Sequence, residues 1–283
     1  MYFFKYYSPE DYKFLFKPNG ISLRFSQPRI LNDPFELLFV YDSLSQNTKI
    51  KMKEDILEKK GGYKEIENLA LSSAKPIKEL FENHNNDHQK IDRLIDMLYA
   101  NIQFLEQDKI NNKLNDTFGI LSFTPQGYSR PMWSYYGKNH TGFAVEFDPY
   151  SLNLPSSNNE NTVIKGVEYE NERPKNLHPS EGLDPIFEAL YTKDDEWTHE
   201  DEWRLVYPLK CIPITGSDPT GAPLHTHILN SKHVHKVLLG ALSSKATEEE
   251  ITKWIKDHAP HVKLHKLSLS KINYQLDYTE IEI

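Results

Sequence analysis

Cysteine is almost absent from this sequence, since Cys211 is the only one among 283 residues. A single thiol excludes an intramolecular disulfide and a zinc cluster built from the cysteines of one chain. The sequence also lacks a signal-peptide pattern and any run of about 20 apolar residues. We therefore expect a soluble protein of a reducing compartment, the cytoplasm, that does not enter a membrane.

Basic residues are too few to predict a broadly positive surface. The sequence holds 33 Lys and Arg against 41 Asp and Glu, which gives a formal net charge of -8. An extended surface that binds nucleic acid by neutralising phosphates is therefore not expected. The hydrophobic set makes up 38% of the residues, which is enough for a folded core and unlike a disordered chain.

The common catalytic motifs are missing as well: there is no Walker loop, no dinucleotide-binding glycine fingerprint, no HExxH and no GxSxG. Four histidines that could hold a metal lie close together, at His225, His227, His233 and His235. No clear acidic or cysteine partner stands near them to complete a ligand set. We expect no metal and no cofactor.

The apolar patterns that are present predict an α+β protein. A strand at residues 2–7 is followed by a short helix, in which Ser8, Pro9 and Asp11 serve as N-cap, first-turn proline and capping-box acid. Further strands are predicted at residues 21–26, 117–124, 141–147, 163–170 and 202–207, with a helix at 185–191. A strand at 234–240, a helix that Thr247 caps with Glu250, and a strand from 262 form a C-terminal β-α-β unit. The expected core is a mixed, mainly antiparallel sheet.

Residues 44–115 differ in composition from the rest of the chain. They are rich in Lys, Glu, Asn and Ile, and Ile91, Leu94, Ile95 and Leu98 follow helical spacing. We predict an inserted helical lobe of two or three amphipathic helices there. No internal repeat or long low-complexity linker divides the sequence, so we predict one composite domain over residues 1–283.

The first candidate site combines a strand with the turn that follows it. Arg24 and Ser26 share one face of the predicted strand and could present a guanidinium and a hydroxyl to a polar ligand. Asn32 and Asp33 belong to the adjacent turn. The alternative is a salt bridge and an Asx-turn with no ligand.

The second candidate site is aromatic. Ser122 and Thr124 share a strand face, and Trp133, Tyr136 and His140 offer flat surfaces that suit a ring or base. The alternative is that these aromatic side chains are part of the hydrophobic core.

The third candidate site is acidic. Glu200 and Glu202 are two residues apart, so in a strand both carboxylates would point the same way and could hold a ribose hydroxyl and stabilise positive charge. The alternative is an acidic turn that enters a strand, with Arg204 neutralising it.

Taken together, these segments resemble a known family. Tyr6, LRFSQPRILNDPFE at 23–36, LSFT at 121–124, PMWSYYGKNHTGFAVEFD at 131–148 and EDEWR at 200–204 are similar to the hallmark blocks of the bacterial family called domain of unknown function 2971. The blocks occur in order from Tyr6 to Arg204. The central lobe and the region after Pro208 carry none of them.

The same layout more weakly resembles the ADP-ribosyltransferase superfamily, with an aromatic first strand, a middle strand bearing serine and a late strand bearing glutamate. This resemblance implies NAD as substrate, Tyr6 or Arg24 at the first NAD-contacting position, Ser122 as the middle-strand serine and Glu202 as the catalytic glutamate. It further implies an enzyme that transfers ADP-ribose or hydrolyses NAD, a role as a toxin or phage-defence effector, and a macromolecular acceptor or a cognate antitoxin or immunity protein as partner.

Two other functions remain open from the residues. One is a non-catalytic module that senses a nucleotide or another small ligand in the aromatic and acidic pocket. The other is a metal-dependent nuclease or hydrolase that uses Asp33, Glu36, Glu146 and Glu202 around a divalent ion.

Overall fold

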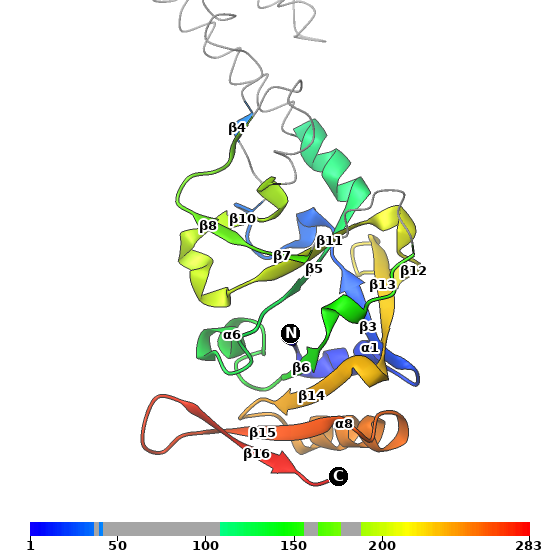
Figure 1. Ribbon diagram of the computed structural model, residues 1–283, viewed down its shortest axis with the longest axis vertical. Helices are drawn as coiled ribbons and strands as arrows, with labels where there is room; N and C mark the ends of the chain where they lie inside the picture. The colour runs from blue at the N-terminus through cyan, green and yellow to red at the C-terminus, as the bar shows by residue number, and fades with distance from the viewer. Residues whose placement is uncertain (37–39, 42–107, 156–163, 177–187) are drawn as a thin grey trace, which may run out of the picture. The chain divides into compact units, whose positions relative to one another are not determined.

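The computed structural model describes residues 1–36, 40–41, 108–155, 164–176 and 188–283 (Figure 1). The chain divides into two compact units: one comprises Met1–Glu36, Leu114–Asn171 and Tyr191–Ile283, and the other comprises Leu37–Lys113 and Glu172–Leu190. The predicted helical lobe at 44–115 lies largely outside the described residues. Its described part, from residue 108, is helical, and this helix continues to residue 117. One composite domain stays a prediction.

Five strands form the largest sheet of the first unit, in the order β1 (Phe3–Tyr7), β6 (Phe143–Phe147), β14 (Val234–Leu239), β15 (Lys263–Leu269) and β16 (Leu276–Ile281). Only β14 and β15 are parallel. Helix α8 (Lys245–His258) makes the crossover that parallel neighbours require, and buries Ile251 and Ile255. The predicted β-α-β unit is confirmed.

The N-cap of α8 differs from the prediction. The Ser244 hydroxyl accepts a hydrogen bond of 3.2 Å from the Thr247 N–H, so Ser244 is the cap and Thr247 lies in the first turn. The prediction of Thr247 was wrong because the helix begins earlier than its apolar residues indicate.

Two further sheets of the first unit are antiparallel. One has the order β12 (Ile214–Ser217), β13 (Pro223–Asn230), β3 (Gly20–Phe25) and β2 (Phe16–Lys17), and the other has the order β5 (Phe118–Phe123), β11 (Trp203–Pro208) and β7 (Ile164–Gly166). A small parallel sheet pairs β10 (Thr192–Asp194) with β8 (Glu168–Glu170). The single strand predicted at 163–170 is therefore two strands with different partners. In the second unit, β4 (Val40–Tyr41) pairs with β9 (Lys175–Asn176).

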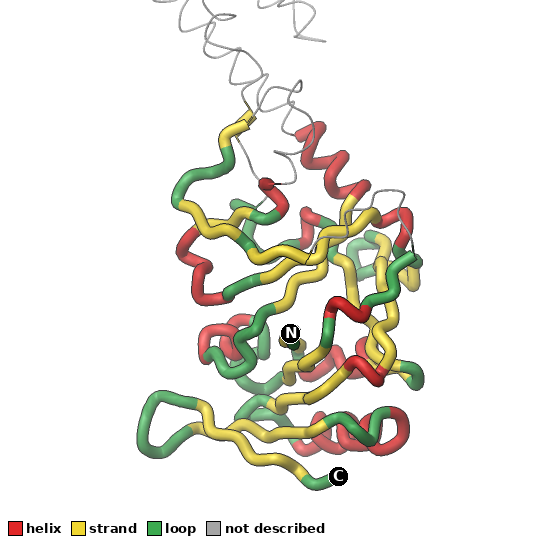
Figure 2. Tube along the Cα trace, viewed as in Figure 1, coloured by secondary structure: helices red, strands yellow, loops and turns green. Residues whose placement is uncertain are grey.

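The helical elements of the described chain are short apart from α8 and the helix at 108–117 (Figure 2). They include α1 (Tyr12–Leu15), α6 (Arg130–Tyr135) and the 3-10 helices η1 (Pro9–Asp11), η2 (Pro28–Ile30), η3 (Pro149–Ser151), η5 (Asp195–Glu200), η6 (Leu209–Cys211) and η7 (Ser231–His233). The predicted capping box of Ser8 and Asp11 is present at η1. Within the described ranges, no helix has the length and apolar character of a membrane span.

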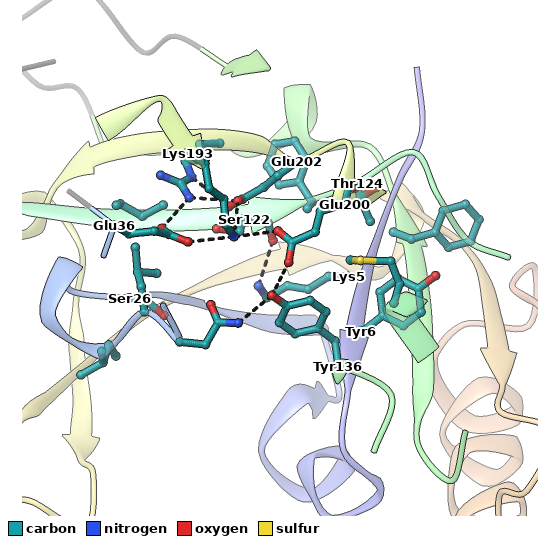
Figure 3. A pocket seen from close by; sticks show the side chains of 18 residues that line it. Lys5, Tyr6, Ser26, Glu36, Ser122, Thr124, Tyr136, Lys193, Glu200 and Glu202 are labelled. Atoms are coloured by element: carbon teal, nitrogen blue, oxygen red, sulfur yellow. Dashed lines mark hydrogen bonds and ion pairs between the residues drawn. The ribbon is translucent and has the colours of Figure 1, made fainter. Parts of the chain in front are cut away.

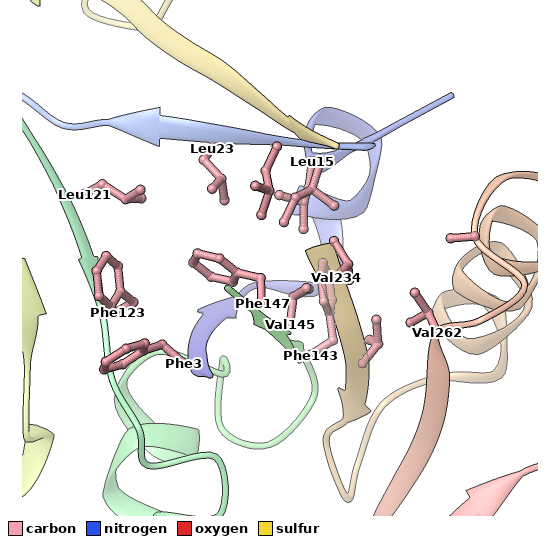
Figure 4. Close-up of a cluster of buried hydrophobic side chains, with 14 of the residues drawn as sticks. Phe3, Leu15, Leu23, Leu121, Phe123, Phe143, Val145, Phe147, Val234 and Val262 are labelled. Carbon is pink, nitrogen blue, oxygen red and sulfur yellow. The ribbon is translucent and has the colours of Figure 1, made fainter. Parts of the chain in front are cut away.

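Aromatic side chains join the sheets of the first unit into one core (Figure 4). Phe3 of β1 packs edge-on against Phe123 of β5 with ring centroids 4.9 Å apart, and Phe123 meets Phe147 of β6 at 6.0 Å. All three rings are almost completely buried, and each stabilises the fold by roughly 1.5–3 kcal/mol. The core thus holds β1, β5 and β6 at fixed positions beside the site described next.

Strand β5 has one edge that is only partly covered. At one end, Phe4 of β1 and Thr124 exchange backbone hydrogen bonds of 2.7 and 2.9 Å, and at the other end Ser26 and Ile120 exchange two of 2.8 Å. Because backbone groups alternate along a strand, Ser122 presents its N–H and C=O to this same edge, between the two bridges. The edge is therefore split open at Ser122.

Candidate functional site

A cavity of about 240 Å³ lies at this split (Figure 3). Its walls come from separate parts of the first unit, namely β1, the segment after β3, β5, α6, β10 and the start of β11. Apolar side chains such as Phe4, Ile120 and Met132 share the lining with charged groups.

A buried lysine stands at the centre of the charged wall. The Nζ of Lys193 lies 2.7 Å from a carboxylate oxygen of Glu36, 2.7 Å from one of Glu200 and 3.4 Å from one of Glu202. Its side chain is 2% exposed. Burial alone would lower the pKa of Lys193, but the three carboxylates raise it above the ordinary value, so the ammonium stays charged.

Arg204 is the second cation of this network. Its Nε lies 2.8 Å from one oxygen of Glu202, its Nη2 lies 2.9 Å from the other, and Nη2 also lies 2.7 Å from Glu36. Burial would raise the pKa of Glu202, but the paired Arg204 with its hydrogen bonds, and then Lys193, lower it to about 2. Glu202 is therefore ionised at neutral pH.

Glu200 binds differently from Glu202. One of its oxygens accepts a hydrogen bond from the Tyr136 hydroxyl, which in turn accepts one of 2.7 Å from the Asn32 amide. Burial first, and then the Glu200 carboxylate, raise the pKa of Tyr136 and keep the phenol protonated. The backbone carbonyl of Glu200 accepts a 2.6 Å hydrogen bond from Thr124, which ties this residue to the end of β5.

A left-handed residue directs both acids toward the cavity. Glu200 ends η5, and Asp201 follows with φ 45° and ψ 51°, so β11 starts only at Trp203. The prediction that a strand points both carboxylates the same way was therefore wrong, since neither Glu200 nor Glu202 belongs to a strand. Both acids line the cavity because the chain turns sharply at Asp201.

The cavity is also lined by Tyr6 and Lys5 of β1 and by Ser122 of β5. The Tyr6 hydroxyl donates a hydrogen bond to the backbone oxygen of Gln126, and burial raises its pKa. Ser122 helps to lower the pKa of Glu202 by a side-chain hydrogen bond. The Lys5 ammonium donates a 2.9 Å hydrogen bond to the Ser122 carbonyl, and burial lowers the pKa of Lys5 to about 8.

The structure brings most of the predicted residues together. The cavity lining includes Tyr6, Ser26, Asn32, Ser122, Thr124, Tyr136, Glu200, Glu202 and Arg204.

Four predicted residues do not line the cavity. Arg24 instead lies 3.4 Å from Asp218, and the Asp33 carboxylate accepts a 2.9 Å hydrogen bond from the N–H of Phe35, so both follow the salt-bridge and Asx-turn alternative. Trp133 is fully buried and donates its indole N–H to Gly127, because its ring belongs to the core. His140 stacks on Trp133 at 6.2 Å and faces a different groove.

The four acids of the hydrolase alternative do not all meet. Glu146 pairs with Lys236 at 3.4 Å, and Asp33 is occupied by its turn. Glu36 and Glu202 do converge, yet the position between them and Glu200 holds the Lys193 ammonium. Among the described residues, no group of three or more His, Cys, Asp or Glu could hold a metal ion.

Three charged residues that line the cavity were not among the site residues predicted from the sequence. They are Lys5, Lys193 and, outside the hydrolase alternative, Glu36. The signal for Lys193 was its position as the single basic residue directly before an acidic segment, residues 194–202. Lys5 was visible only as a charged residue among the aromatic side chains of the first strand.

Residues 132–205 match the model of a family described as protein of unknown function (DUF2971). The match begins in α6 and ends in β11, so it includes Tyr136, Glu200, Glu202 and Arg204 of the cavity. No curated protein and no solved structure matches the chain.

Proposed function

We propose that the cavity binds the nicotinamide-ribose end of NAD and that the protein consumes NAD, as an ADP-ribosyltransferase or an NAD glycohydrolase. The observation that carries this proposal is the convergence of Tyr6, Ser122 and the ionised Glu202 on one cavity. Pockets for drug-sized ligands measure roughly 300–1,000 Å³, so a cavity of about 240 Å³ suits one ring with its sugar and leaves the rest of the dinucleotide outside.

The charges suit the departure of nicotinamide. The bond between ribose C1 and the pyridinium nitrogen breaks, its electron pair goes to the nitrogen, and positive charge develops on the ribose. A fixed carboxylate near that charge stabilises the transition state. Water or the hydroxyl or amine of an acceptor then attacks C1 and gives up a proton.

The two acids contribute differently to this reaction. Glu202 already takes three hydrogen bonds from Arg204 and Lys193 and one from Ser122, whereas Glu200 takes two, from Tyr136 and Lys193. A carboxylate offers about four lone-pair sites. Glu200 therefore has more capacity to accept a ribose hydroxyl, and Glu202 acts mainly through its charge.

The test follows NAD binding by calorimetry and nicotinamide release by chromatography on the same samples. Wild type should bind and release, Glu202→Gln should bind with release lowered about 100-fold or more, and Glu200→Gln should bind more weakly. Glu196→Gln is the matched control, since Glu196 is an exposed acid of the same 3-10 helix. Absence of both binding and release in wild type would refute the proposal.

The second candidate function is a non-catalytic sensor of a nucleotide or similar ligand. The observation that favours it is that Glu202, the acid that would act in the reaction, is held by both Arg204 and Lys193. A sensor would bind NAD or a fragment of it with the same affinity in wild type and Glu202→Gln, and would release no nicotinamide. The same experiment thus separates the two functions.

A further inference from the structure

A second hollow of the first unit lies on the surface beside the β15–β16 hairpin. It is an open groove of about 490 Å³ that shares no lining residue with the first cavity. One side is Arg130, the first residue of α6, together with His140, and the other side is the hairpin segment from Leu269 to Leu276.

The charge of this groove is opposite to that of the protein. Its ten lining residues include Arg130 and Lys271 but no Asp or Glu, whereas the whole chain carries a formal net charge of -8. Neither cation has an ion-pair partner among the described residues. Two such cations at one groove create a local positive potential that attracts anions.

The remaining groups of the groove suit an oxygen-rich anion. Ser270 adds a hydroxyl, and Asn273 adds an amide that donates one hydrogen bond of 3.1 Å to the Gln275 side chain and keeps a second N–H to donate. The Arg130 guanidinium lies over the Tyr274 ring at 5.9 Å, a contact that orients its planar fork without neutralising its charge. A phosphate group has enough oxygens to accept hydrogen bonds from a guanidinium fork and an ammonium together.

We propose that this groove binds the phosphate group of a small phosphorylated ligand, with Arg130 and Lys271 as the two cationic contacts. The site is separate from the NAD cavity and does not depend on the activity proposed there. Helix α6 connects them, because Arg130 faces the groove and Met132, two residues later, lines the cavity.

The test is a thermal-shift titration of the full chain with inorganic phosphate at constant ionic strength, with chloride as the balancing anion. Specific binding raises the melting temperature of wild type saturably. The Arg130→Gln/Lys271→Gln double variant should bind phosphate roughly tenfold more weakly or worse, because each charged hydrogen bond contributes substantially. Both side chains are exposed, so the variant should fold normally.

Two controls decide the interpretation. Lys256→Gln removes an exposed lysine of α8 and should leave the phosphate response unchanged, as should Glu202→Gln in the other cavity. An equal rise in melting temperature in wild type and the double variant would show a general effect of phosphate as a salt, and would overturn the proposal. No saturable response in wild type would overturn it as well.

Discussion

Replacing Lys193 by Met should destabilise the protein far more than the loss of an ordinary ion pair. Three carboxylates, Glu36, Glu200 and Glu202, share two cations in the network, so the variant leaves three negative charges against Arg204 alone. The Lys193 side chain is 2% exposed, so removing its ammonium leaves buried carboxylates without their cation. Breaking such a buried pair costs about 3–5 kcal/mol of the free energy of unfolding.

The assay is urea denaturation at pH 7, followed by circular dichroism and tryptophan fluorescence. Lys165→Met is the matched control, because Lys165 pairs with Glu168 at 2.6 Å while both side chains are about half exposed, at 42% and 60%. That control should lose less than about 1 kcal/mol. A loss of this small size in Lys193→Met would refute the idea that the network depends on its central lysine.

The pH dependence gives a second, independent check. In wild type the pKa of Glu202 in the fold, about 2, lies below the ordinary 4.5, so its contribution to stability is present above pH 4.5 and is lost as the pH falls toward 2. Without Lys193, Glu202 loses one of the positive charges that lower its pKa, so its pKa rises from about 2 toward the ordinary value. The variant then loses less stability than wild type as the pH falls, and its deficit relative to wild type should shrink between pH 4.5 and pH 2. A deficit that stays constant over this range would contradict the electrostatic explanation.

Three further changes test other features. Glu202→Gln should remove most of the wild-type stability loss between pH 4.5 and 2.5, about 2 kcal/mol for a pKa near 2, which urea midpoints across this range would show. Gly142→Ala should lower the free energy of unfolding by about 1–3 kcal/mol, because an added Cβ would lie 2.0 Å from the Tyr7 carbonyl oxygen. Gly216→Ala is the control, since an added Cβ there would lie 3.9 Å from its nearest neighbour and should change the melting temperature little. Ser244→Ala should cost about 1 kcal/mol and speed amide exchange in the first turn of α8; exchange at the wild-type rate would argue against the cap.

Strands rich in apolar and aromatic residues could be predicted from the sequence. The predictions at 2–7, 21–26, 117–124 and 141–147 match β1, β3, β5 and β6. Apolar alternation marks the buried side of β3, whereas β1 and β6 are rich in apolar residues and are buried on both faces. Strand β13 was missed. Its sequence PLHTHILN mixes polar and apolar residues, and it is held by neighbours on both sides, β12 and β3, rather than by its own pattern.

The candidate site was predicted in part. Ser122, Tyr6 and Glu202 were grouped by their resemblance to a family layout, and the structure places all three at one cavity. Lys193 could not be found in this way, since a lysine in a three-residue strand normally lies at the surface and only the packing of Glu36 and Glu200 makes it central. Trp133 illustrates the converse, because a large aromatic ring suits a ligand pocket and a core equally well.

The pairing of β3 with β13 affects the order in which the protein can be made and folded. Phe25 of β3 lies opposite His225, a separation of 200 residues along the chain. Ribosomes add roughly 5–20 residues per second, so β13 is synthesised on the order of 10–40 s after β3. The aromatic residues of β1 must wait in turn for β6, where Phe3 meets Phe147. Folding of the first unit is therefore completed only after most of the chain has been translated.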